Sequence, residues 1–233
     1  MHELLLFTQI PASRHDQVLH VLAGVTAAQP IECREQNLIY MQTKLADVAV
    51  SKKAPNKQAP PAQRLSYRKL FRDLPNGVDG HAGPWKLRAE ELPEAGITHV
   101  LSRPVAENVI DPTELEKFRG ASIWYKYVNQ YITTTHRFVN SNVIVRVSRL
   151  FLPPEGTGAL EPLDAPLPNL SECRPLDASG TYLVEASVRI EDGGNAKLVE
   201  QATQELLAFK ATLAGSVDLR VPDRLALDPR VKA

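Results

Sequence analysis

Residues 123–152 read IWYKYVNQYITTTHRFVNSNVIVRVSRLFL. The pattern predicts two long strands, about 123–139 and 142–152. They are joined by Asn140-Ser141-Asn142, and asparagine tolerates the positive φ that a tight turn requires. The segment therefore predicts an antiparallel hairpin.

The first of these strands carries an aromatic cluster, which is the most distinctive candidate for a partner interface. Its members are Trp124, Tyr125, Tyr127 and Tyr131. Simple alternation places the three tyrosines on one face, with Trp124, Val128 and Ile132 on the other. Both faces are apolar, so one is expected to cover a core and the other a helix or a partner. Tyrosine and tryptophan are enriched at interface hot spots, although burial within the chain is the alternative for most of them.

Further strands are predicted on both sides of the hairpin, at residues 2–10, 31–43, 64–72, 84–88, 97–110 and 181–190. The total is seven or eight strands, and most are neighbours along the chain, which favours antiparallel pairing. Closing such a sheet removes its exposed edges. We therefore predict a mainly β (α+β) protein, an antiparallel β-barrel of about eight strands with flanking helices.

Three helices are predicted around these strands. The first covers about 14–27, where Ser13 and Asp16 have the spacing of a capping box. A short one starts at Asp111 as N-cap, with Pro112 at N1, and closes at Gly120. A long one follows the turn at 192–195 and stops at Gly215.

Two segments lack the side chains needed to offset the entropy of ordering. Residues 44–64 hold three prolines, five basic residues and one acid, and residues 153–177 hold six of the 18 prolines. Both are predicted to be mobile surface loops. The strands beyond each loop need partners, so residues 1–233 are predicted to form a single β-barrel domain.

Composition restricts the classes of function. There are 27 basic and 27 acidic residues, and this zero net charge argues against a dedicated nucleic-acid binder or sequence-specific DNA binding. A neutral surface suits a protein inside an assembly. The two cysteines have no pairing or metal-ligand spacing, and no apolar run approaches the ~18 residues of a membrane span. A soluble, intracellular protein without a membrane partner is expected.

No catalytic motif is present, so no catalytic residue, metal or cofactor is predicted. One enzyme class needs a specific test, because barrels with charged interiors can hydrolyse triphosphates through a metal held by Glu-x-Glu pairs on strands. The Glu-x-Glu pair here is Glu114-Leu115-Glu116, which falls in the predicted short helix. The charge cluster that would hold a cation is therefore predicted to be missing.

The strand at 64–72 is the best candidate for contact with RNA. It carries Arg64, Arg68 and Arg72, with Tyr67 and Phe71 between them, and this mixture can track a backbone and stack bases. The alternative is a half-buried strand with its arginines solvated. We favour the second interpretation, because the net charge supplies no attractive field.

Several segments together resemble fungal Mediator subunit 18. They are the opening MHELLLFTQIPASRHDQVLHVLAGVTAAQP, then GPWKLR, FVNSNVIVRVSRLFLPP, TYLVEASV and DPRV, and they span residues 1 to about 231. The resemblance implies a nuclear, non-catalytic barrel of the Mediator head module, with a fold related to tunnel-type RNA triphosphatases. It also implies pairing with Mediator subunit 20, docking of the C-terminal helix of Mediator subunit 8, and coupling to RNA polymerase II. The alternative from the residues is a metal-dependent RNA 5'-triphosphatase-like or RNA-binding barrel.

Overall fold

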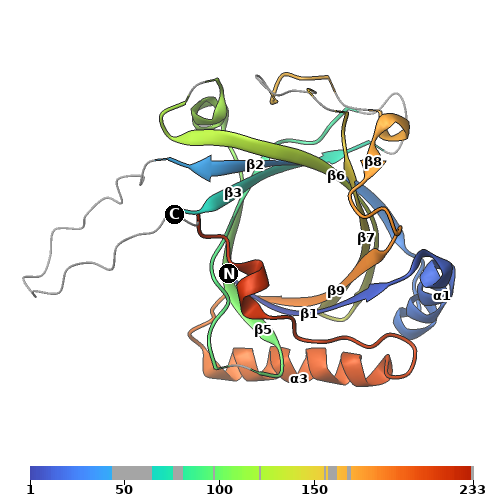
Figure 1. Ribbon diagram of the computed structural model, residues 1–233. Coiled ribbons are helices and arrows are strands. Elements are labelled where there is room, and N and C mark those ends of the chain that lie inside the picture. The colour runs from blue at the N-terminus through green and yellow to red at the C-terminus, as the bar shows by residue number, and fades with distance from the viewer. Residues whose placement is uncertain are drawn as a thin grey trace, which may run out of the picture.

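Antiparallel strands close into a barrel in the computed structural model, which describes residues 1–43, 65–75, 81–96, 98–120, 122–154, 156, 162–166 and 169–231 (Figure 1). The strands of the barrel are β1 (His2–Ile10), β2 (Ile31–Gln42), β3 (Tyr67–Leu74), β4 (Lys86–Glu90), β5 (Leu101–Val109), β6 (Tyr125–Asn140), β7 (Val143–Leu152) and β9 (Tyr182–Ile190). Among the described residues the order around the barrel is β6-β2-β3-β4-β5-β1-β9-β7, and β7 pairs back with β6. The predicted eight-stranded barrel is confirmed.

The β6–β7 hairpin closes the ring. Its pairing runs from Ile132 opposite Phe151 to Asn140 opposite Val143. The positive φ of the turn, 53°, falls on Ser141 rather than on an asparagine. The hairpin was thus predicted correctly, but the residue that bends the chain was not.

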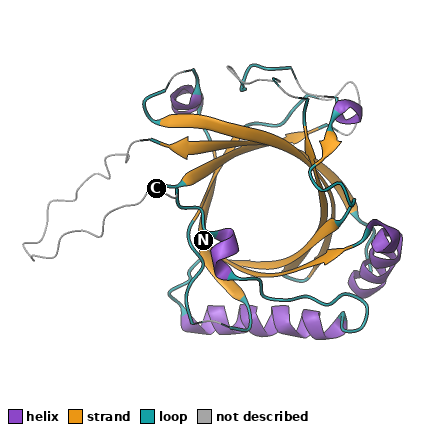
Figure 2. Ribbon diagram, in the orientation of Figure 1, coloured by secondary structure: helices purple, strands orange, loops and turns teal. Residues whose placement is uncertain are grey.

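Helices lie on the outside of the barrel (Figure 2). The bounds are α1 His15–Thr26, α2 Pro112–Leu115 and α3 Ala196–Thr212. Asp111 caps α2 as predicted, since its Oδ1 accepts from the backbone N of Glu114 at 2.9 Å. The predicted capping box of α1 is wrong: a 3-10 turn, Ala12–Arg14, leads into this helix, and Arg14 stands at the N-cap without a side-chain cap.

The main hydrophobic core lies between the barrel wall and the helices, not inside the barrel. Helix α3 packs across β9, β1 and β7, and α1 packs against β6 (Figure 1). The strands contribute Leu4, Leu6, Val145, Val147, Val184, Ala186 and Val188, and the two helices contribute Val18, Leu22, Ala202, Leu206 and Phe209. A second outer cluster covers β2 and β3 and contains Leu38, Tyr40, Leu70, Trp85, Ile110, Phe118 and Leu163.

The two predicted loops differ in how much the structure describes. Residues 44–64 lie outside the described residues. The described part of 153–177 includes a 3-10 turn, Leu170–Glu172, and β8 (Arg174–Pro175), which pairs with the end of β7. A single domain with two mobile loops stays a prediction. Within the described residues, no helix has the length and apolar character needed to cross a bilayer.

Replacing Leu206 by alanine tests the outer core. Leu206 has no exposed surface, whereas Leu198 on the same helix is 38% exposed. We expect Leu206→Ala to lower the free energy of unfolding by about 2–5 kcal/mol, through lost apolar burial and a cavity. Leu198→Ala should lower it by less than about 1 kcal/mol. Urea denaturation followed by circular dichroism measures both, and equal losses would contradict a core placed under α3.

Candidate functional site

The interior of the barrel is a charged cavity of about 450 Å³. Alternate residues of the strands face it, because the other face of each strand packs outward against the two clusters. The charged residues that line it are Glu35, Lys69, Asp73, Lys86, Arg88, Glu90, Arg103, Glu107, Arg137, Arg146, Glu185 and Arg189. The polar face of the barrel is therefore the enclosed one.

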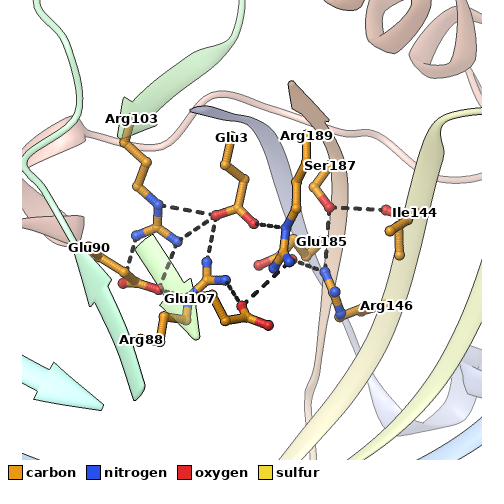
Figure 3. Close-up of polar contacts among 10 residues, drawn as sticks. All are labelled: Glu3, Arg88, Glu90, Arg103, Glu107, Ile144, Arg146, Glu185, Ser187 and Arg189. Carbon is orange, nitrogen blue, oxygen red and sulfur yellow. Dashed lines mark hydrogen bonds and ion pairs between the residues drawn. The ribbon is translucent and has the colours of Figure 1, made fainter. Parts of the chain in front are cut away.

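Glu3 is the centre of this interior (Figure 3). Its side chain is 1% exposed. Its Oε2 accepts from Nη2 of Arg88 at 2.6 Å and from Nη2 of Arg103 at 3.1 Å. Its Oε1 accepts from Nε of Arg189 at 2.9 Å. One carboxylate therefore joins strands β1, β4, β5 and β9.

Two further glutamates extend these contacts into a network. Glu90 accepts from Nε of Arg88 at 2.6 Å and from Nη1 of Arg103 at 2.8 Å. Glu107 accepts from Nη1 of Arg88 at 2.8 Å and lies 3.4 Å from Nη1 of Arg189. We call these three glutamates and three arginines the Glu3 network. Its six formal charges cancel, so the barrel encloses them as a neutral unit.

The pKa values follow from this arrangement. Burial alone would raise the pKa of Glu3, but Arg88, Arg103 and Arg189 outweigh it and hold the pKa at about 2. Burial, with Glu90 and Glu35 nearby, raises the pKa of Tyr131 to about 12. At neutral pH the interior therefore holds ionised carboxylates and a neutral phenol.

The sequence did not predict the mixed-sign charge cluster in the barrel interior. A triphosphatase-type interior would need like-charged Glu-x-Glu pairs, whereas this interior is built from alternating residues of mixed sign. The signal lay in Lys86-Leu87-Arg88-Ala89-Glu90, which places three charges on one face of β4. Across the described residues, His, Cys, Asp and Glu side chains form no group of three or more that could hold a metal ion.

The aromatic cluster is divided by a β-bulge. Ile39 lies opposite Asn129 and Tyr40 lies opposite Tyr127, so Val128 is an extra residue in β6. The bulge reverses the alternation: Tyr131 lines the interior, while Tyr125 and Tyr127 pack on the second outer cluster. Tyr125 stacks on Phe118 with ring centroids 4.0 Å apart. The prediction that the three tyrosines share a face was wrong.

Trp124 remains at the surface, just before β6. It is half-buried, and together with the exposed Ile123 it lines a shallow hollow of about 390 Å³. Val128, on the bulge, is 46% exposed. We call Ile123, Trp124 and Val128 the β6 rim.

The structure describes two of the three candidate basic residues, Arg68 and Arg72, and both lie on β3. Arg64 lies outside the described residues. Arg68 donates to Oγ of Ser66 and to the carbonyl of Tyr67. Arg72 donates to Oε1 of Gln36 at 2.8 Å, and its guanidinium lies 4.4 Å from the ring centroid of Trp85. Arg72 is therefore engaged in packing the outer wall.

Comparison with known proteins identifies the family. A family model described as Med18 protein matches residues 2–230. The chain belongs to the Med18 family. A relative from Coccidioides immitis (strain RS) is 31% identical and one from Aspergillus oryzae (strain ATCC 42149 / RIB 40) is 30% identical, each over the full length of both chains. Both carry the name Mediator of RNA polymerase II transcription subunit 18.

A solved structure shows the same fold. A chain in the structure of the Schizosaccharomyces pombe Mediator head module has a TM-score of 0.69 and 17% identity, covering 95% of this chain and 99% of that chain. A looser likeness, at a TM-score of 0.42 and 8% identity, is to the S. pombe Pct1 RNA triphosphatase, over 91% of this chain and 83% of that one. Membership of the Med18 family makes this barrel a structural Mediator subunit that acts in transcription regulation, not an enzyme.

Replacing Glu3 by glutamine tests the Glu3 network. Glutamine removes the charge but keeps the shape, and it leaves three guanidiniums, two of them buried, without their shared counterion. We expect the free energy of unfolding to fall by about 3–5 kcal/mol. Glu200→Gln, at an exposed position of α3, is the control and should change it by less than about 0.5 kcal/mol.

The depressed pKa of Glu3 predicts that the stability of the protein depends on pH. The pKa of Glu3 is depressed from its ordinary value of 4.5 to about 2 in the folded protein. Its contribution, about 3 kcal/mol, is therefore present above pH 4.5 and is lost as the pH falls toward 2. Urea midpoints of the wild type should drop more steeply over this range than those of Glu3→Gln, and parallel curves would contradict the network.

Proposed function

We propose that this protein is a structural subunit of the Mediator head module in the nucleus, where it helps to couple transcription regulators to RNA polymerase II. The observation that carries the proposal is the Med18 family match, which extends over residues 2–230. The barrel's likeness to a chain of the S. pombe head module supports it. The zero net charge fits a subunit held by neighbouring proteins rather than by nucleic acid.

The partners we propose are Mediator subunit 20 and the C-terminal helix of Mediator subunit 8. For the helix, the chain offers a groove of about 550 Å³ between the ends of β1 and β9 and the C-terminal segment. Phe7, Leu183, Pro222 and Leu227 give this groove apolar walls. An amphipathic helix binds by laying its apolar face into such a groove.

For subunit 20 we propose the β6 rim. Ile123 is 58% exposed and lines the same hollow as the half-buried Trp124, and Val128, four residues further along the chain, is 46% exposed. Tyr125 and Tyr127 pack on the second outer cluster, and Tyr131 lines the barrel interior. The β6 rim is therefore the part of the predicted aromatic interface that is still available to a partner. Partly exposed tryptophan beside aliphatic side chains is typical of interface hot spots.

Co-expression with both partners tests the assignment. We expect a 1:1:1 complex of this chain, Mediator subunit 20 and the C-terminal segment of subunit 8, measured by size-exclusion chromatography with light scattering. A monomeric chain that co-elutes with neither partner would refute the proposed role.

Matched substitutions assign the two surfaces. Leu225 and Leu227 lie in the same 3-10 turn (Arg224–Leu227), but Leu227 lines the groove while Leu225 is 54% exposed. We expect Leu227→Asp to release the subunit 8 segment and Leu225→Asp to retain it.

A second matched pair tests the β6 rim. Ile123→Asp should weaken binding of subunit 20 by at least about 2 kcal/mol, a hot-spot effect, whereas Val139→Asp should not. Binding is measured by calorimetry, and equal effects within either pair would reject that surface.

A further inference from the structure

Two histidines meet where the first turn of α1 lies on the outside of the barrel wall. His15, the first residue of α1, stacks on Tyr182 of β9 with ring centroids 4.2 Å apart. Its second ring neighbour is His136 of β6, at a centroid distance of 5.1 Å. The side chains of His15 and His136 are only 14% and 26% exposed. The three rings therefore join the start of α1 to two strands at a point that solvent reaches poorly.

The hydrogen bonding of His15 leaves one ring nitrogen without a partner. Its Nδ1 donates to Oδ1 of Asp16 at 2.8 Å, so Nε2 carries the lone pair of the neutral ring. Nε2 is buried and has no hydrogen-bond partner among the described residues. A proton added there would be a buried donor without an acceptor, which is costly. Asp16 is exposed, so solvent screens the support that it gives to a charged ring.

His136 is also kept neutral by its surroundings. Burial, followed by the neighbouring His15, lowers the pKa of His136. Glu32 and Asp16 act in the opposite direction without cancelling this shift. Glu32 is exposed, and its Oε1 is 3.9 Å from Nε2 of His136, too far for a hydrogen bond. The folded protein therefore disfavours a positive charge on this ring.

Arginines on the neighbouring strands add to the positive charge around the two histidines. The guanidinium of Arg149 on β7 lies 5.7 Å from the ring centroid of Tyr182. Arg149 and Arg34 of β2 both lie opposite Thr134, which is two residues before His136 and on the same face of β6. Both arginines stay charged at any pH at which histidine titrates. Each imidazolium would thus form beside existing cations.

We propose that His15, His136 and Tyr182 form an acid-sensitive latch for α1. With both imidazoles neutral, the contacting rings hold the first turn of the helix on the barrel wall. Protonation places like charges on rings 5.1 Å apart and buries a donor without an acceptor, so the first turn detaches. Val18 and Leu22 have no exposed surface and keep the rest of α1 docked. The latch does not depend on the proposed Mediator partners.

The pH range of the latch differs from that of the Glu3 network. Because folding lowers the pKa of His136 below its ordinary value of 6.5, the unfolded chain binds more protons. This contribution to stability is therefore complete above pH 6.5 and is lost as the pH falls below that value. The contribution of Glu3 is lost only below pH 4.5. A comparison of about pH 7.5 with about pH 5.5 tests the latch while Glu3 remains ionised.

Amide hydrogen exchange of the full-length chain is the direct test. The backbone N–H groups of residues 19–22 bond to carbonyls of the first turn of α1, so release of that turn exposes them. After correction for the intrinsic effect of pH, their protection in the wild type should fall by about threefold or more from about pH 7.5 to about pH 5.5.

Two variants show whether this fall comes from the latch. His136→Phe keeps a ring at the site but cannot be protonated, so its protection should change much less with pH. His20→Gln is the matched control, because His20 is exposed on α1, and it should behave as the wild type does. An unchanged wild type, or an equal fall in His136→Phe, would overturn the proposal.

Nuclear magnetic resonance of the imidazole protons adds a readout on the wild type itself. His136 should titrate with a midpoint below pH 6.5. In His15→Phe the midpoint should rise, because a neighbouring positive charge is removed while the ring is kept. A midpoint at or above pH 6.5 in the wild type would refute the latch, and so would a midpoint that His15→Phe leaves unchanged.

Discussion

The ion pairing of Glu3 with Arg88, Arg103 and Arg189 is the interaction on which the rest of the architecture depends. A carboxylate enclosed without counterions costs several kcal/mol or protonates. Held by three guanidiniums, it fixes β1, β4, β5 and β9 around a polar interior. A barrel with such an interior has no core inside it. Its apolar faces must point outward, and α1, α3 and the segment around Phe118 are needed to cover them.

The barrel encloses its polar face and turns its apolar face outward, and this arrangement explains what the sequence could and could not predict. Alternation in β9 separated Val184, Ala186 and Val188 from Glu185 and Arg189, and the structure agrees. Alternation does not say which face is enclosed, because a charged face inside a barrel has the same pattern as a solvated one. The sequence of β4 therefore did not indicate that its charged residues face the barrel interior. Only the pairing of distant strands, such as β1 with β9, brings Glu3 to Arg189.

The β-bulge at Val128 could not be predicted from the sequence for a different reason. It carries no glycine or proline signal, and it arises from the mismatch between β6 and the partner strand β2. One extra residue moves Tyr131 into the interior and leaves Tyr125 and Tyr127 outside, so the aromatic cluster serves two environments. The part of the aromatic cluster left exposed is therefore smaller than the sequence suggests, and it is limited to the β6 rim.

The charged interior also bears on why a barrel of this kind can serve as a scaffold. A divalent cation binds carboxylate oxygens, and in this barrel those of Glu3, Glu90 and Glu107 are already engaged by arginines at 2.6–3.4 Å. A metal would have to displace charge-assisted hydrogen bonds that join four strands, and stability would be lost with them. The acidic groups thus act as cross-links of the barrel wall. This use of the interior agrees with the structural role of the Med18 family.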